Sequence, residues 1–544
     1  MKKKLLYFFL ALIILIALVG LSISTLVSSY LDTTLNSNPD RKNEIFFESL
    51  SISLIRSRIE LKNLEIKPLN TEEEATLISG SVKKAEISGY SIWDFLVSKE
   101  LTIGELSFLN PSFKIIQNDT LVSHSKSAKP FQRLFGDIVS RGKIKNFSIV
   151  DGQGDYFIQG DSLRRVGGFK EFNLDADGLE TDSVMVGHAI PFQVENIYTS
   201  FTNLNYQLND DQNLYVGSFE FDFKSGQLEF KDLGLSFDKS WQEIARTKAF
   251  QTDIIDFHIG SLSISKLNTS SRLYDSLLIM AGSIVVDSLV FRDGRDKNIP
   301  RPRDEIKKNF TTMLEALQFP IEVDSLFLKN SKITYSEIEE GKTKPGILAL
   351  EDVNGLITNL TSIDSSESKL PLTIDIKAKL NGKGKLNFKL IENYHSKTFQ
   401  ANVSLGAMNM VGLNPTLSNL AGIEIESGQL IQLYLEILAG PTKSDNHFVM
   451  DYSDLKMVLL DKEKGKNGVL STVANLAINK DNLPKNKNYK TPSYSTQRNI
   501  FRGPINLIWL SIKDGLMSII PTGFAQKLIP PSKEGEKRKS RTGK

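Results

Sequence analysis

Cysteine is absent from all 544 residues of the chain, and this absence removes several kinds of structure and chemistry at once. Without thiols the chain has no disulfide bonds, no thiolate zinc sites, no cysteine nucleophile and no lipidated N-terminal cysteine. Stability must therefore come from the burial of apolar side chains and from the pairing of backbone groups.

An excess of charge of one sign is also missing. The chain has 66 basic and 64 acidic residues, so its formal net charge at pH 7 is only +2. Proteins that bind nucleic acid carry basic surfaces that neutralise phosphates, and this composition therefore speaks against a nucleic-acid partner. The length allows three or four domains of about 150 residues each, although all-β architectures often extend further as one unit.

Motifs for catalysis and metal binding are lacking as well. The sequence has no Gly-x-Ser-x-Gly elbow, no Walker motif and no dinucleotide fingerprint. None of the histidines stands in a metal-binding pattern, and they are His124, His188, His258, His395 and His447. We therefore predict that the protein is not an enzyme and has no catalytic, cofactor-binding or metal-binding residues. A site assembled from residues far apart in the sequence stays open at this stage.

Long apolar runs are scarce, and the clearest one lies near the N-terminus. Residues 5–23 contain no charged side chain and follow Lys2, Lys3 and Lys4. As a helix rising ~1.5 Å per residue this run reaches about 28 Å, close to a hydrocarbon core of about 30 Å. A cleaved signal peptide is the alternative, but its apolar region usually has about 7–15 residues. We predict an uncleaved transmembrane anchor within residues 1–30, with a cytoplasmic N-terminus and the bulk of the chain across the membrane.

From about residue 44 to residue 479, apolar and polar residues alternate, which predicts a mainly β chain. The alternation is strict at residues 372–380 and 386–390, as expected for strands with one apolar and one polar face. Between them, residues 381–385 are suited to a hairpin turn because asparagine and glycine tolerate positive φ. Similar strands are expected at residues 219–223, 423–426 and 433–437.

Helices are expected at only a few places in this chain. The internal candidates are residues 93–97, 131–139 and 304–317. Near the C-terminus Pro504 suits a first helical turn, and apolar residues at helical spacing follow it, namely Ile505, Ile508, Trp509, Ile512, Leu516, Ile519 and Ile520. We therefore predict an amphipathic helix within residues 501–530.

Two interpretations of this C-terminal helix stay open. It caps the end of the sheet, or it contacts a membrane or an envelope protein partner, and both can hold because a capping helix can also touch a membrane or a protein. Residues 480–500 before it are expected to be a linker, and residues 531–544 a disordered basic tail. The segment 533–544 has six basic and two acidic residues, so it could approach anionic head groups at ~1 kcal/mol per basic residue.

A degenerate nine-residue frame recurs within the β-rich region. Its pattern is apolar-x-x-apolar-x-apolar-x-(Asn/Asp)-(small or Pro), which predicts a strand whose phase slips by one residue before a turn. Complete copies begin at Ile103, Ile144, Val286 and Val323, and partial copies begin at Leu61, Ile87 and Ile259. The irregular spacing favours one architecture lengthened by similar strands over a strict solenoid.

A long amphipathic sheet allows two arrangements that periodicity alone does not distinguish. If its apolar faces close against one another, the chain forms ordinary sandwiches or barrels. If the sheet curls into an open trough, its apolar face can shield acyl chains, whose exposure to water costs ~0.8 kcal/mol per methylene. Roughly 25 strands at ~4.8 Å spacing would make a trough on the order of 100 Å long.

Several stretches together resemble the AsmA-like family of bacterial envelope proteins, in the form found in Bacteroidota. Besides the anchor and the frame, the resemblance rests on residues 320–326, 332–337, 348–360, 428–430 and 452–456. Each motif alone has low specificity for the family, but their order along the chain supports the resemblance, most clearly between residues 284 and 479. The resemblance implies an inner-membrane anchor and a periplasmic, taco-like β-groove, formed by a long curled antiparallel sheet, that moves phospholipid between the inner and outer membranes. The family carries no catalytic motif, so it assigns no role to any residue.

We therefore expect an N-terminal part of the groove at residues 31–280 and a C-terminal, AsmA-like part at residues 281–479. The expected function is the binding or conduction of membrane phospholipids through an apolar groove. A non-enzymatic scaffold or assembly factor for outer-membrane components is the alternative. An uninterrupted lining of Leu, Ile, Val and Phe favours the lipid hypothesis, whereas buried polar residues favour a packed scaffold.

Overall fold

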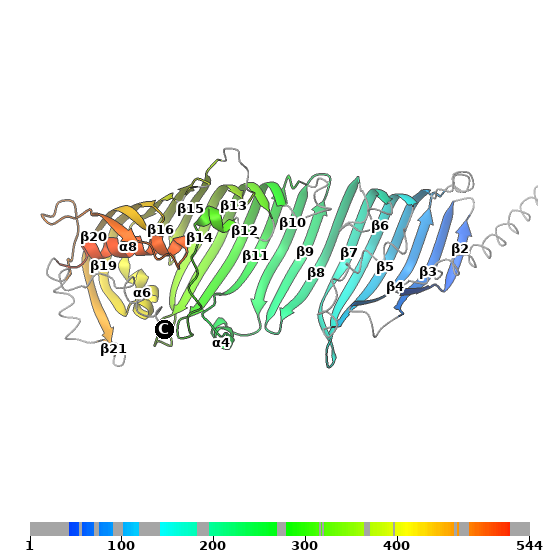
Figure 1. The fold of residues 1–544 in the computed structure, drawn as a ribbon, viewed down its shortest axis with the longest axis horizontal. Helices are drawn as coiled ribbons and strands as arrows, with labels where there is room; N and C mark the ends of the chain where they lie inside the picture. The colour runs from blue at the N-terminus through cyan, green and yellow to red at the C-terminus, as the bar shows by residue number, and fades with distance from the viewer. Residues whose placement is uncertain are drawn as a thin grey trace, which may run out of the picture. The chain divides into compact units, whose positions relative to one another are not determined.

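A computed structural model describes most of the chain, including the residues that form its strands (Figure 1). The described residues are 43–53, 57–69, 76–90, 102–118, 142–181, 195–268, 279–314, 317, 320–363, 370–394, 396, 398–461, 465–466 and 478–522. Two compact units share them: one from Met1–Leu233 and Ser265–Leu277, the other from Gly234–Ile264 and Leu278–Lys544. The chain therefore passes between the units three times, whereas the sequence analysis placed a single boundary after residue 280.

The first unit is a sheet of strands joined mainly in antiparallel fashion. The pair β5 and β6 is parallel, in register from Thr102↔Lys143 to Asn118↔Gln159. The strands are β1 (Asn43–Phe46), β2 (Ser49–Ser53), β3 (Arg58–Pro68), β4 (Thr76–Ser88), β5 (Thr102–Asn118), β6 (Gly142–Gln159), β7 (Leu163–Thr181), β8 (Asn196–Asn209), β9 (Gln212–Asp222) and β10 (Gln227–Phe237), the last of which continues past the unit boundary.

The second unit combines a sheet with several helices. Its described strands are β11 (Ile254–Ser265), β12 (Ile279–Asp296), β13 (Ile321–Ile338), β14 (Gly346–Thr361), β15 (Leu372–Leu380), β16 (Gly384–Glu392), β17 (Phe399–Leu405), β18 (Met408–Asn409), β19 (Ile423–Ala439), β20 (Lys443–Asp461), β21 (Gly465–Lys466) and β22 (Ser493–Gln497). Its described helices are α4 (Trp241–Thr247), α5 (Phe310–Leu314), η4 (Met410–Leu413), α6 (Asn414–Leu420) and α8 (Pro504–Ile519). Here β12 and β13 are parallel, whereas the successive neighbours from β13 to β17, and the pairs β17 with β19, β19 with β20 and β20 with β22, are antiparallel.

The prediction of a mainly β chain is confirmed, but the sheet is mixed rather than purely antiparallel. Parallel neighbours require a long crossover connection, and residues 297–320 provide one between β12 and β13. An alternating pattern records which face a residue occupies and carries no information on the direction of the neighbouring strand. Among the helices that the structure describes, none is long and apolar enough to cross a bilayer. The predicted anchor at residues 1–30 lies outside the described residues.

The local predictions have mixed outcomes. The hairpin is confirmed, because β15 and β16 pair antiparallel around a turn in which Asn381 and Gly382 have positive φ. The strands expected at 423–426 and 433–437 are parts of one strand, β19. The helix expected at 304–317 begins later than predicted, since residues 304–309 are not helical and Phe310–Leu314 are helical among the described residues of this range. The candidates at 93–97 and 131–139 lie outside the described residues.

The C-terminal predictions also need correction. Residues 480–500 were expected to be a linker, but they contribute β22, which pairs with β20, and the buried Asn482. The C-terminal helix is confirmed over Pro504–Ile519, whereas its buried face differs from the predicted one. Ile505 and Trp509 belong to the predicted apolar face, yet 71% and 45% of their surfaces are exposed.

The nine-residue frame marks a bend within a strand and not a turn at its end. Asn110, Asp151 and Asn330, the eighth residues of three frames, have φ between 48° and 55° and lie well inside β5, β6 and β13. Asparagine and aspartate tolerate this left-handed conformation better than most residues. In the fourth frame the predicted position of the bend is wrong. The frame places it at Asp293, but the positive φ is at Ser288, which lies opposite Asn330 in the parallel register of β12 and β13.

The same hydrogen-bond arrangement fixes this bend in both units. In the first unit, the Asp151 backbone N–H donates to Asn173 Oδ1 at 3.0 Å, and Asn173 Nδ2 donates to the Glu171 carbonyl at 2.9 Å. In the second unit the corresponding bonds measure 3.2 and 2.9 Å and join Asn330, Asn354 and Asp352. Glu171 and Asp352 also have positive φ. The two units thus contain equivalent parallel pairs followed by equivalent antiparallel strands.

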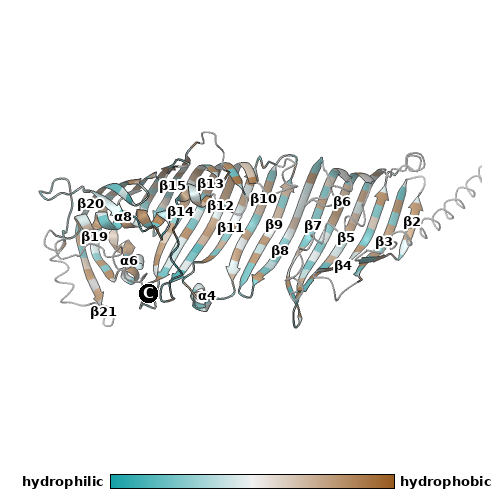
Figure 2. Cartoon of the chain, in the orientation of Figure 1, coloured by the Kyte–Doolittle hydropathy of each residue, from teal (hydrophilic) through white to brown (hydrophobic). Residues whose placement is uncertain are grey.

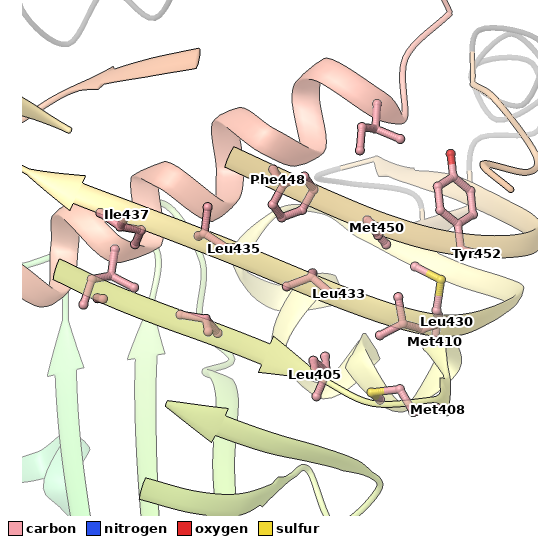
Figure 3. Close-up of a cluster of buried hydrophobic side chains, with 14 of the residues drawn as sticks. Leu405, Met408, Met410, Leu430, Leu433, Leu435, Ile437, Phe448, Met450 and Tyr452 are labelled. Atoms are coloured by element: carbon pink, nitrogen blue, oxygen red, sulfur yellow. The ribbon is translucent and has the colours of Figure 1, made fainter. Parts of the chain in front are cut away.

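The largest buried cluster lies in the second unit, where α8 packs against β19, β20 and β22. Figure 3 shows Leu433, Leu435 and Ile437 of β19 beside Phe448 and Met450 of β20 in this cluster. A glycine at position 515 permits the contact, because a Cβ there would lie 2.6 Å from the Phe448 ring. Smaller buried clusters lie in the first unit, and one of them contains the first three apolar positions of the frames that begin at residues 103 and 144.

Candidate functional site

Apolar side chains form continuous cross-strand rows on one face of the second unit. Directly opposed residues of neighbouring strands share a face. The first apolar row follows such pairs from β12 to β19 through Ile284, Leu326, Ile357, Ile374, Leu390, Ala401 and Ile437. The second apolar row runs beside it through Val286, Leu328, Gly355, Ile376, Phe388, Val403, Leu435 and Phe448. Because the rows cross many strands, this face is apolar over a wide area.

From β15 to β20 the opposite face of these strands is polar. Residues next to the apolar rows point the other way, since successive side chains of a strand alternate. One polar row connects β15 to β20 through Asp375, Lys389, Asn402, Glu436 and His447. Figure 2 shows the resulting alternation of hydrophobic and hydrophilic bands along individual strands. The sheet of the second unit is therefore amphipathic from β15 to β20, whereas on β12, β13 and β14 the same row continues with the apolar residues Val285, Phe327 and Leu356.

Burial changes along the first apolar row. Leu390, Ala401 and Ile437 are each only 1% exposed, because α8 and neighbouring side chains cover this end of the sheet. Ile284 and Leu326, by contrast, are half-buried and belong to none of the buried clusters that the described residues form. The same face is therefore a packed core towards β20 and a partly open apolar surface on β12, β13 and β14.

The crossover between β12 and β13 forms part of the cover. Its Phe310 packs against Phe399 with ring centroids 5.7 Å apart. Thr311 Oγ1 donates to Glu392 Oε1 at 2.8 Å, and Arg498 Nη1 donates to Asn309 Oδ1 at 2.6 Å. The crossover is thus held by polar contacts at the point where the open surface gives way to the core.

Glu392 is a buried carboxyl on this face, on which Ser444 and Asn446 of β20 are further buried polar residues. It pairs across the strands with Leu372 and Phe399, and it is fully buried. Burial raises the pKa of the Glu392 carboxyl above its usual range, although hydrogen bonds from Thr311 act in the opposite direction. The crossover is therefore attached to the sheet by the hydrogen bond between Thr311 and Glu392, a carboxyl whose protonation depends on its burial.

A cluster of charged side chains borders the apolar face at the ends of β12 and β13. Arg295 donates to both carboxylate oxygens of Asp253, at 2.6 Å each. Tyr335 Oη donates to Glu337 Oε2 at 2.7 Å. Burial, together with the charge of Asp253, raises the pKa of Asp293 to about 6. The apolar face therefore has a polar margin at this edge of the sheet.

The first unit repeats the amphipathic design. Its apolar row crosses seven strands, interrupted by one threonine, through Leu61, Ala85, Phe108, Ile149, Leu174, Thr199 and Phe221. The neighbouring positions form a polar row of Glu60, Glu86, Ser107, Ser148, Asp175, Tyr198 and Asp222. Aromatic rings extend the apolar face on β8, β9 and β10, since Phe219 lies 4.8 Å from both Phe201 and Phe230, measured between ring centroids. All three rings are half-buried.

The polar face of the first unit contains a shallow depression. Among its lining residues, Asn146 Nδ2 donates to Asp177 Oδ1 at 2.8 Å, and Asp175 lies nearby. Burial and the charge of Asp177 raise the pKa of the Asp175 carboxyl. In the same lining, Ser88 Oγ donates to Glu105 Oε2 at 3.3 Å, and this pair lies at the exposed surface of the protein.

Histidines do not form a site in the part of the chain that the structure covers. His447 lies on the polar row, with its Nδ1 3.1 Å from Ser493 Oγ, and His258 lies in β11. His124, His188 and His395 are outside the described residues. Within the described ranges, no group of three or more potential ligands could hold a metal ion.

No family model matches this chain, and no relative is found among curated proteins. The resemblance to the AsmA-like family therefore rests on the sequence stretches named above.

Proposed function

We propose that the protein binds phospholipids along the apolar faces of its sheet units and conducts them between the inner and outer membranes of a bacterial envelope, without catalysing a reaction. The observation that carries the proposal is the partly open apolar surface on β12 to β14, where Leu326 and Ile357 are half-buried. Each acyl methylene moved from water to such a surface gains ~0.8 kcal/mol. Two chains of common length therefore gain more than about 10 kcal/mol in total.

The remaining elements of the proposal come from the sequence. An apolar run at residues 5–23 behind a lysine cluster suits an inner-membrane anchor with the bulk of the chain in the periplasm. The polar rows on the opposite faces suit contact with water, while the apolar rows suit contact with lipid. Membrane phospholipids are thus the proposed partners.

A scaffold or assembly factor for outer-membrane components is the second candidate. Glu392 is a buried polar interruption of the apolar face, and such interruptions are expected in a packed scaffold. This candidate predicts a stable protein partner and an unchanged lipid balance when the gene is deleted. The half-buried residues on β12 to β14 favour the lipid hypothesis, because the interruption lies at the covered end of the face.

Photo-crosslinking in cells tests the proposal on neighbouring residues of one strand. A photoreactive phenylalanine analogue replaces Ile376, on the second apolar row, or Lys377, which is exposed on the polar face of β15. Mass spectrometry of the irradiated full-length protein should find a phospholipid adduct at position 376 and none at position 377. A protein adduct at position 376, with no lipid adduct, would instead support the scaffold.

A further inference from the structure

The helix α8 has two faces with different environments. Pro504, Leu507, Ile508, Ser511, Gly515 and Ile519 are buried against the sheet. On the opposite side every fourth residue is exposed, which defines the α8 stripe of Ile505, Trp509, Lys513 and Met517. The exposed fractions of its apolar members are 71% for Ile505, 45% for Trp509 and 38% for Met517.

Large apolar residues are unusual on the solvent side of a helix that already packs through its other face. The outer face of such a helix is normally charged or polar. Sealing the core does not require Ile505 or Trp509, because Leu507 and Ile508 are the residues that enter the buried cluster. The α8 stripe is therefore an apolar surface that the described part of the fold leaves uncovered.

Basic residues outnumber acidic residues in the sequence segments that adjoin α8. Lys513 lies within it, and residues 498–522 contain three basic residues and one acidic residue, Asp514, which accepts a hydrogen bond from Thr496 at 2.8 Å. The crossover reaches this region too, because the Lys307 backbone N–H donates to the Ile500 carbonyl at 2.8 Å. Residues 301–308 contain four basic and two acidic residues, and the neighbouring Ile306 is 72% exposed. The sequence that follows adds six basic and two acidic residues at 533–544.

We propose that the α8 stripe docks on a phospholipid bilayer whose surface carries anionic head groups. Isoleucine and tryptophan side chains suit the boundary between acyl chains and head groups, where the apolar ring is buried and the indole N–H stays hydrated. Lys513, which is exposed on the stripe, then faces the head groups, whose negative charge attracts it. The contact does not depend on lipid lying in the apolar rows, so it goes beyond the proposed function.

Vesicle capture by the full-length protein tests this contact. The protein is held on beads by a tag at its N-terminus and is offered labelled vesicles of phosphatidylcholine, alone or with about one-third phosphatidylglycerol. The variant Ile505→Ser/Trp509→Ser is compared with Ile391→Ser/Leu438→Ser, which changes two residues of the polar face that are 47% and 52% exposed. The N-terminal apolar run is the same in all of them, so differences between variants report on α8.

The stripe variant should capture about tenfold fewer anionic vesicles than the wild type, while the control pair captures as many as the wild type. Vesicles with brominated acyl chains should quench a component of tryptophan fluorescence that Trp509→Phe removes. Equal capture of anionic vesicles by the wild type and the stripe variant would overturn the proposal, as would an equal loss on vesicles without phosphatidylglycerol. Phospholipid bound to the purified protein, measured separately, should be the same in the stripe variant, which separates this test from that of the proposed function.

Discussion

Replacing Asp293 by asparagine should make the protein more stable at neutral pH. Burial, reinforced by the charge of Asp253, raises the pKa of this carboxyl from 3.8 to about 6 in the folded protein. Its contribution to stability is therefore complete below the unfolded pKa of about 3.9 and is lost as the pH rises through about 6. Asparagine imitates the protonated side chain at every pH, so it avoids this loss.

The size of the effect follows from the difference between the two pKa values. A difference of about 2 units corresponds to about 3 kcal/mol, which solvent at this half-buried site reduces to about 1–2 kcal/mol. Asp293→Asn should therefore raise the free energy of unfolding by that amount at pH 7.5 and change it little at pH 3.5. Asp253→Asn is the matched control, and it should lower stability at pH 7.5 because Arg295 loses a carboxylate that accepts two hydrogen bonds.

Urea unfolding of the full-length protein in mild detergent, followed by circular dichroism between pH 3.5 and 7.5, measures both effects. The difference between Asp293→Asn and the wild type should grow as the pH rises from about 4 to about 6. A difference that stays constant across this range, or a variant less stable than the wild type at pH 7.5, would refute the assignment of a perturbed carboxyl.

Three further predictions concern packing and the strand bends, and each is measured by urea unfolding. Gly515→Leu should cost about 1–3 kcal/mol or displace α8, because a Cβ at this position already meets Phe448 at 2.6 Å. Leu435→Ala should lower the free energy of unfolding by about 2–5 kcal/mol, because Leu435 is 0% exposed. Ile374→Ala should lower it clearly less, because Ile374 is half-buried. Equal losses would contradict the decrease in burial from β20 towards β12. Asn330→Val should cost about 1–2 kcal/mol and Asn330→Gly less, because φ is 49° there. Equal losses would show that the hydrogen bond from Asn330 Nδ2 to Asp287 Oδ1, at 3.1 Å, matters more than the backbone conformation.

Alternating residues predicted the strands well because the sheet has one apolar and one polar face. The segment from Leu372 to Leu390 is correctly predicted as a hairpin, since each apolar residue lies on the apolar face and Asn381 and Gly382 supply the positive φ of the turn. The direction of neighbouring strands was not predictable in this way. The pairs β5 with β6 and β12 with β13 are parallel, and their alternation is the same as that of antiparallel strands.

Features that depend on tertiary contacts were missed. The short helix α4 begins with a capping box formed by Ser240 and Glu243, a signal that the sequence does contain, but its few residues give no helical periodicity. In α8 the apolar spacing predicted the helix but not its buried face, because the close approach at Gly515 selects the side that faces the sheet. The open surface on β12 to β14 likewise depends on where the crossover and α8 end, which local pattern does not encode.

The matching strand bends of the two units suggest that one segment of the gene was duplicated. Asp151 and Asn173 in one unit and Asn330 and Asn354 in the other form the same bonds, separated by about 180 residues of sequence. Such correspondence is typical of tandem duplication followed by divergence. A chain with this ancestry changes its length in steps of several strands, so related genes should encode proteins that differ by whole multiples of this segment.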